Sequence, residues 1–151
     1  MFRKIRRLAG LDRTTLRFYI EAFVLLGWAR TLLYYKFSRV APQLGRRGEE
    51  TAIQADPKQL AFLNHIANSI NTISRYTPWQ SKCLVRAIAG MKMLERRGID
   101  STLYLGTGKD EEGKLIAHAW LRSGPYYISG AEVMDRFVTV DKFAKSALNN
   151  R

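Results

Sequence analysis

The chain has 151 residues, which is enough for one domain with a sizeable core, and its 46% hydrophobic and 25% charged residues are ordinary for a globular protein. Its single cysteine, Cys83, excludes an internal disulfide, and no apolar run approaches the length of about 20 residues that a membrane-spanning helix requires. The amino-terminal segment is basic but lacks the apolar core of a secretory signal. We therefore expect a cytoplasmic protein without a transmembrane segment.

The net charge of +12 is concentrated near the amino terminus. Residues 1–48 contain eleven Lys and Arg residues against Asp12 and Glu21, so nine of the twelve net positive charges lie there. Such a charge is compatible with nucleic acid, an anionic membrane surface or an acidic peptide partner, and equally with a solvated helix face. No nucleic-acid fingerprint accompanies it, so we expect no nucleic-acid partner.

The first half of the chain has the hydrophobic period of helices. Apolar residues predict one long helix over residues 11–37, ended by Pro42 and Gly45 and followed by a polar linker at 46–50. We therefore divide the chain into a basic helical extension at residues 1–50 and a second domain at residues 51–151. A second helix is predicted after Asp56 and Pro57, which together form a helix start signal.

The third predicted helix contains the only cysteine. Thr77 followed by Pro78, or alternatively Ser81, is the predicted start of this helix, and Gly98 follows its predicted end. Either start places Cys83 in the first turns, where unpaired amides and the helix dipole favour a thiolate. Cys83 is therefore a candidate nucleophile. The alternative is that it is a small buried apolar residue.

After this helix the hydrophobic period changes from helical to alternating. The alternation predicts antiparallel strands at residues 101–106, 115–122, 126–129 and 137–140, with a short terminal helix from Asp141 onward. Helices followed by an antiparallel meander define an α+β fold.

The second predicted strand carries His118, on the same strand face as Ile116 and Trp120. A cysteine at a helix N-terminus that packs against a strand carrying histidine is the arrangement of a Cys–His nucleophile pair. The imidazole of such a pair holds the thiolate and later protonates a leaving amine. Cys83 and His118 are therefore candidate partners in catalysis.

Four short motifs follow one another along the second half of the chain: SKCLVRAIA at 81–89, LERRGI at 94–99, LYLG at 103–106 and AHAW at 117–120. Their order and separation resemble the transglutaminase-like cysteine proteases, and more narrowly the lasso-peptide leader peptidases, the family of the microcin-maturation protease C-terminal domain. The resemblance covers residues 76–143, and short motifs near Glu21, Ala29 and Pro42 resemble the helical extension of the stand-alone members. It implies a transglutaminase/papain-like core in which the catalytic cysteine, at a helix N-terminus, packs on a small antiparallel sheet.

The resemblance also implies hydrolysis of a peptide bond, without a metal or cofactor. Members remove the leader from a ribosomally synthesised precursor peptide, before a partner cyclase closes the macrolactam, and stand-alone members work with a separate leader-recognition protein. By position, Cys83 is the nucleophile and His118 the general base and acid. Gln80 is a candidate oxyanion donor, and the amide of Cys83 itself is the alternative.

The residue that orients His118 is where the sequence departs from the family. Transglutaminase-like enzymes usually place an aspartate on the neighbouring strand, whereas the residues expected to face His118 are Ser129 and Gly130. Glu132 is the nearest carboxylate and the candidate third catalytic residue, with a backbone carbonyl or Ser129 as the alternative. Two other functions stay open: a catalytically idle transglutaminase-like adaptor that binds peptide, and a basic protein that binds nucleic acid or a membrane surface.

Overall fold

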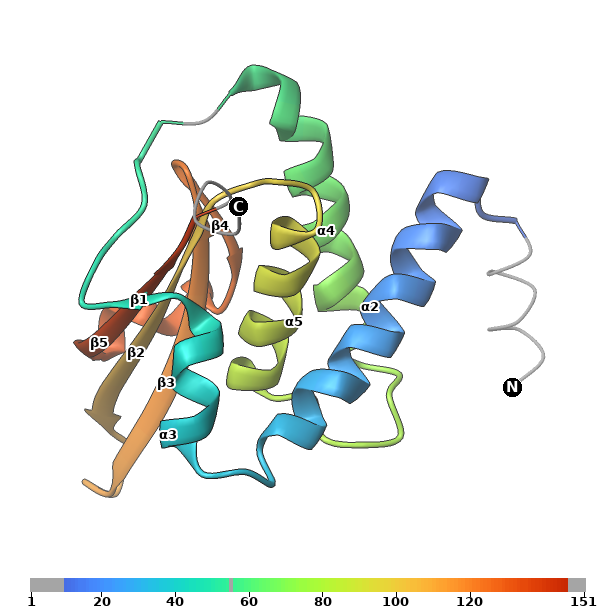
Figure 1. The fold of residues 1–151 in the computed structure, drawn as a ribbon. Coiled ribbons are helices and arrows are strands. Elements are labelled where there is room, and N and C mark those ends of the chain that lie inside the picture. The colour runs from blue at the N-terminus through green and yellow to red at the C-terminus, as the bar shows by residue number, and fades with distance from the viewer. Residues whose placement is uncertain (1–9, 55, 147–151) are drawn as a thin grey trace.

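The computed structural model describes residues 10–54 and 56–146. Helices α4 and α5 cover one face of an antiparallel sheet of five strands, and α2 packs across these two helices (Figure 1). The helical elements are α2 (Arg13–Leu32), α3 (Phe37–Val40), η1 (Ala41–Leu44), η2 (Pro57–Gln59), α4 (Leu60–Ile73), α5 (Cys83–Glu95) and η3 (Ala131–Arg136). Helices on one face of an antiparallel sheet confirm the α+β fold.

The sheet has the strand order β1–β5–β2–β3–β4, and all neighbours are antiparallel. Its strands are β1 (Arg46–Arg47), β2 (Ser101–Lys109), β3 (Leu115–Ser123), β4 (Tyr126–Ser129) and β5 (Val138–Lys145). The alternating pattern correctly predicted β2, β3, β4 and the start of β5. The terminal helix expected from Asp141 is wrong, because this segment continues β5 and its backbone pairs with β2 as far as Lys145, opposite Ser101.

Helix α5 is the centre of the fold. It lies between α2 and α4 on one side and the sheet on the other, and a helix enclosed in this way is apolar on all sides. Eight of its residues are accordingly buried: Val85, Ala87, Ile88, Ala89, Gly90, Met91, Met93 and Leu94. Gly90 sets the closeness of its packing on the sheet, since an added Cβ there would lie 2.9 Å from Cδ2 of Leu121.

Helix α2 is shorter than the predicted helix at 11–37. The amides of residues 33–35 bond to carbonyls three residues earlier, which tightens and ends the helix after Leu32, and Lys36 is extended before α3 begins. The buried side of α2, which includes Ala22 and Leu26, belongs to the same apolar core as α5. The expected boundary at residue 50 therefore separates segments that share one core. None of the helices in the described ranges is long and apolar enough to span a membrane.

Candidate active site

Cys83 is the first residue of α5, and its thiol is free and half-buried. Lys82 precedes it in an extended conformation (φ −79°, ψ −175°), and no side chain caps the first amides of the helix. These amides and the positive end of the helix dipole are therefore available beside Cys83. The predicted helix starts at Thr77 and Ser81 are wrong, although the placement of Cys83 in the first turn is confirmed.

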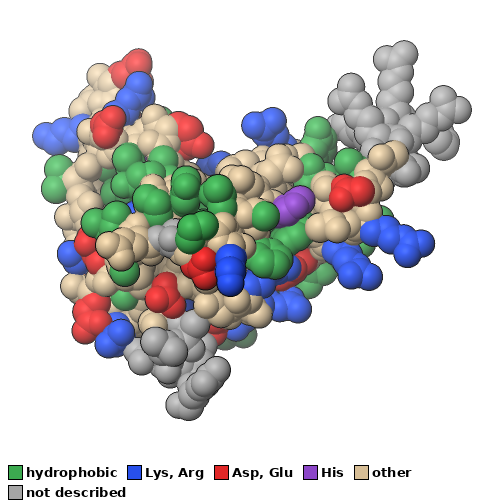
Figure 2. All heavy atoms as spheres, turned by 90° about the horizontal axis from the view of Figure 1, so that it is seen from above, with side chains coloured by type: hydrophobic (Ala, Val, Ile, Leu, Met, Phe, Trp, Pro, Cys, Tyr) green, Lys and Arg blue, Asp and Glu red, His purple; other side chains and the backbone are tan. Residues whose placement is uncertain are grey.

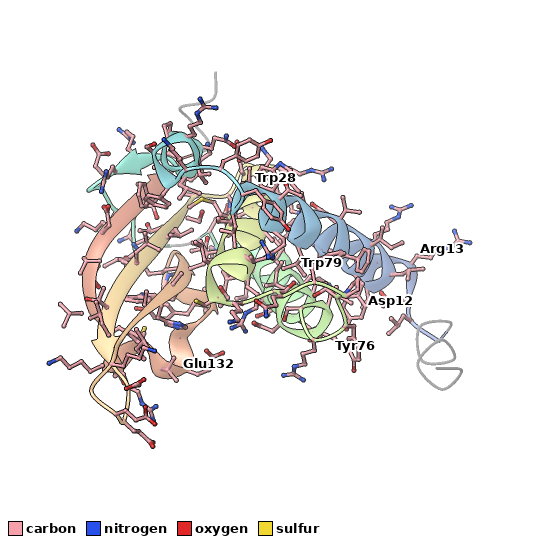
Figure 3. All side chains as sticks on the ribbon, turned by 90° about the horizontal axis from the view of Figure 1, so that it is seen from below. Asp12, Arg13, Trp28, Tyr76, Trp79 and Glu132 are labelled. Atoms are coloured by element: carbon pink, nitrogen blue, oxygen red, sulfur yellow. The ribbon has the colours of Figure 1, made fainter. Side chains whose placement is uncertain are left out.

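The loop that leads into α5 is tied to α2. The hydroxyl of Thr77 donates to the carbonyl of Trp79 at 3.0 Å and lies 2.8 Å from the hydroxyl of Ser81, so both predicted caps close the loop instead of capping the helix. Trp79 packs on α2: its ring lies 5.0 Å from that of Phe23, and a Cβ on Gly27 would lie 3.2 Å from it (Figure 3). The start of α5 is thereby held in place by α2.

His118 lies on β3 within a stack of rings. Its ring is 4.9 Å from that of Phe137 and 5.9 Å from that of Trp120, which stacks in turn on Tyr104 at 5.6 Å. The Nε2 atom of His118 lies 2.7 Å from the carbonyl oxygen of Gly130. A carbonyl oxygen only accepts hydrogen bonds, so Nε2 of the neutral imidazole carries the proton and Nδ1 keeps its lone pair. Nδ1 is therefore the nitrogen that is free to take a proton from a thiol.

The group that orients His118 is thus a backbone carbonyl, one of the alternatives that the sequence left open. Gly130 has φ +80°, and a Cβ there would lie 2.4 Å from the carbonyl oxygen of Ala119, so no side chain fits at this position. Glu132 is exposed on η3 (Figure 3). No hydrogen bond between described residues joins it to His118. Ser129 is buried, but its Oγ has no partner among the residues that the structure describes.

Cys83 and His118 lie at similar distances along their elements from one contact between α5 and β3. Gly90 of α5 packs on Leu121 of β3, and both elements run from this contact toward Glu95 and Ser123, where Lys145 pairs with Glu95 at 3.7 Å. Cys83 precedes Gly90 by seven residues, which corresponds to about 10 Å along the helix. His118 lies three residues, also about 10 Å, along the strand.

The thiol and the imidazole are nevertheless not bonded to each other. Ala119 and Leu121 belong to the core that packs on α5, whereas His118 shares the alternate side of β3 with Trp120. Both Cys83 and His118 lie in the described part of the chain, and no hydrogen bond joins Sγ to the imidazole. The structure places Cys83 at the start of α5 and fixes the tautomer of the His118 imidazole, but it does not show a formed pair.

The candidate oxyanion donors lie beside Cys83. Gln80 is exposed, three residues before the nucleophile, and its side chain forms no hydrogen bond to any described residue. The amide of Cys83 itself lies at the uncapped N-terminus of α5, where its N–H has no partner within the helix. Both donors therefore stay candidates.

Three buried polar atoms near α5 lack a hydrogen-bond partner among the described residues: Asn71 Oδ1, Arg86 Nε and Ser129 Oγ. Sequence patterns indicated no role for Asn71 or Arg86, whereas Ser129 was expected near His118. The amide nitrogen of Asn71 donates to the carbonyl of Ile128 at 3.1 Å, which places this side chain of α4 beside β4. Arg86 lies within the first of the family-like motifs, but periodicity indicated only its place on the helix.

A further feature is a buried arginine on the side of the sheet that carries His118. Arg122 is 5% exposed, and its Nε donates to the hydroxyl of Tyr104 at 3.0 Å. Burial raises the pKa of Tyr104, and the hydrogen bond and charge of Arg122 lower it in part.

A helix that begins at a cysteine, packed on an antiparallel sheet whose second strand carries an anchored histidine, is the core expected of a transglutaminase-like protein. The model of the transglutaminase-like superfamily matches residues 22–142, from within α2 to β5. The chain therefore belongs to this superfamily, which includes cysteine peptidases. No curated protein and no solved structure gives a significant match.

Proposed function

We propose that this protein is a cysteine peptidase that removes the leader peptide from a ribosomally synthesised lasso-peptide precursor. The observation that carries the proposal is the anchoring of His118, because its bond to Gly130 leaves Nδ1 free to serve as the base for the thiol of Cys83. Membership of the superfamily supports peptidase chemistry. The four ordered motifs support the narrower choice of substrate.

In the proposed reaction Cys83 gives its proton to Nδ1 of His118, and its sulfur attacks the carbonyl carbon of the scissile bond. The imidazolium then gives this proton to the leaving amine as the C–N bond breaks. Water, deprotonated by the same nitrogen, hydrolyses the thioester and releases the leader with a free carboxylate. The amide of Cys83, with Gln80 as the second candidate, donates to the oxyanion. This reaction requires Nδ1 within about 3 Å of the thiol, so the proposal includes a movement that brings the imidazole and Cys83 together when the substrate binds.

Single substitutions test the proposal directly. We expect Cys83→Ala and His118→Ala each to abolish cleavage of the precursor, measured by mass spectrometry of the products, while the circular dichroism spectrum is unchanged. His65→Ala is the matched control, because His65 is the only other histidine and stacks on Phe18, on the helical side of the molecule. Cleavage by Cys83→Ala at the wild-type rate would rule the proposal out.

The proposed partners are the precursor, a separate leader-recognition protein and a macrolactam-forming cyclase, and we propose that they meet in the cytoplasm, where the precursor is made. We propose that the basic extension at residues 1–50 contacts the recognition protein. Removal of α2 is a poor test, since its buried side fills the core. Arg13 and Arg17 are exposed on α2, so replacing both by Glu should weaken the complex in a pull-down assay without unfolding the chain.

A catalytically idle adaptor is the second candidate function. The observation that favours it is the missing hydrogen bond between the thiol of Cys83 and the imidazole of His118, both of which the structure describes. An adaptor would bind the precursor without cleaving it, and binding would survive Cys83→Ala. The same cleavage assay, run beside a fluorescence binding assay with labelled precursor, separates the two functions.

A basic nucleic-acid or membrane-surface protein is supported less well. Figure 2 shows one face on which Lys and Arg side chains lie among acidic and hydrophobic ones instead of forming a single patch. A steep fall of nucleic-acid affinity with salt would support this function.

A further inference from the structure

Arg86 is a half-buried cation for which the described residues provide no acceptor. It lies three residues after Cys83 and four before Gly90, so the three share one face of α5. Helical side chains lean toward the helix N-terminus, which brings the guanidinium of Arg86 toward the turn that Cys83 begins. Within the described ranges its Nε is buried without a partner, and no hydrogen bond or ion pair involves its other nitrogens.

Two other arginines, the half-buried Arg97 and the buried Arg122, have acceptors for their guanidinium groups. Arg97 forms a bidentate ion pair with Glu21, with N···O distances of 2.9 and 2.6 Å. Arg122 donates to five oxygen atoms, the nearest being the carbonyl of Gly124 at 2.7 Å. A buried donor without an acceptor lowers the stability of the folded chain, and Arg86 is such a donor next to the candidate nucleophile. An acceptor supplied by a ligand would satisfy this donor.

A second donor without a partner among the described residues lies on β4, near the contact between α5 and the sheet. Ser129 is 4% exposed, and its Oγ has no partner among the described residues. It stands opposite Leu121 in the sheet, at the irregularity where β4 carries one extra residue. Leu121 packs at Gly90, one turn beyond Arg86, so Ser129 occupies the sheet position next to this contact. The uncapped amides at the start of α5 add further donors.

Asn71 Oδ1 is an unpartnered acceptor on α4, but no hydrogen bond within the described ranges joins it to Arg86 or Ser129. The donors that remain, one of them a guanidinium, fit a carboxylate. We propose that Arg86 binds a carboxylate beside Cys83, with Ser129 as a second donor. In the substrate this carboxylate belongs to an acidic side chain close to the scissile bond, a statement that rests on the proposed peptidase function. The anion site itself does not depend on that function.

Alkylation of Cys83 tests the anion site without a peptide. Iodoacetamide and iodoacetate both form an S–C bond with loss of iodide, and the thiol proton goes to solvent, but only iodoacetate carries a carboxylate. The chain has one cysteine, so the mass of the intact protein reports its labelling. We expect the ratio of the iodoacetate to the iodoacetamide rate constant to fall about tenfold in Arg86→Gln, the size of one lost charge-assisted contact. Arg86→Lys should keep part of the preference, because the charge remains.

Lys82→Gln is the matched control, since it removes an exposed cation next to Cys83. It should leave the ratio within about twofold of wild type, because exposed charges are screened. If the ratio of rate constants is unchanged in Arg86→Gln, Arg86 is not the carboxylate site. The same conclusion follows if the ratio falls in Lys82→Gln and not in Arg86→Gln.

If Arg86→Gln does not fold, protection of wild-type Cys83 by succinate decides the question. Succinate should slow labelling by iodoacetamide at constant ionic strength, and an absence of protection overturns the site. If iodoacetamide labels Cys83 rapidly and iodoacetate is not preferred over it, the proposed Arg86 site is wrong, but the peptidase proposal is unaffected. Failure of both reagents to label Cys83 overturns both.

Discussion

The imidazole of His118 is fixed by the backbone of Gly130, whose carbonyl oxygen lies 2.7 Å from Nε2. Transglutaminase-like enzymes usually give this task to an aspartate, but the crowding of Gly130 against Ala119 leaves no room for any side chain. A carbonyl fixes the tautomer and the ring orientation as a carboxylate does. Because it carries no full charge, it stabilises an imidazolium less than a carboxylate would.

The first prediction concerns this carbonyl. Gly130→Ala should lower the free energy of unfolding by roughly 2–4 kcal/mol, because the new Cβ meets the Ala119 carbonyl and the residue has a positive φ. Displacement of the carbonyl should also release His118 and reduce precursor cleavage. Gly113→Ala is the matched control: it has φ +77° with nothing within 4 Å, so it should lose only about 1 kcal/mol and keep its activity. Equal losses in both variants, measured by urea unfolding, would show that the close contact is unimportant.

The second prediction concerns the anchoring of the loop before α5. Trp79→Ala removes the packing on Phe23 and Gly27, and amide hydrogen exchange over residues 77–83 should become faster in mass spectrometry. Trp28→Ala is the control, because Trp28 lies elsewhere on α2 and faces Lys92 (Figure 3). Exchange in the loop should be the same in that variant as in wild type. Unchanged exchange in Trp79→Ala would mean that the loop is held by its own hydroxyl contacts.

The third prediction concerns Arg122. Arg122→Leu should lower the free energy of unfolding by about 2–4 kcal/mol, since the carbonyls of Thr51, Ala52 and Gly124 lose their donor. Arg75→Leu, at an exposed arginine, should change it by less than about 0.5 kcal/mol. Urea unfolding followed by circular dichroism measures both. A loss in Arg122→Leu as small as that of the control would contradict a structural role for this network.

The fourth prediction concerns pH. The pKa of Tyr104 is raised above 10.0 by burial, so the folded chain holds the phenolic proton more tightly than the unfolded chain. The stability that this difference contributes is fully present below pH 10 and is lost as the pH rises through the folded pKa. The free energy of unfolding of wild type should therefore fall relative to that of Tyr104→Phe above about pH 10. Urea unfolding of both proteins between pH 8 and 11 measures the difference, and parallel curves would count against the shift.

The sequence by itself determined the helical half, the strand half and the elements that carry Cys83 and His118. Local periodicity suffices for this, because the spacing of apolar residues records which side of each element is buried. The glycine at position 98 likewise marked the end of α5 correctly, since it adopts φ +69° there.

Only the tertiary structure decided how the site is assembled. The start of α5 at Cys83 follows from a loop held by Trp79 on α2, and the strand at 138–145 follows from pairing with β2. Gly130 was expected to face His118, but only the structure shows that its carbonyl oxygen, twelve residues away in the chain, bonds to Nε2. Side-chain patterns cannot indicate such contacts, since they depend on backbone atoms that every residue shares and on long-range register.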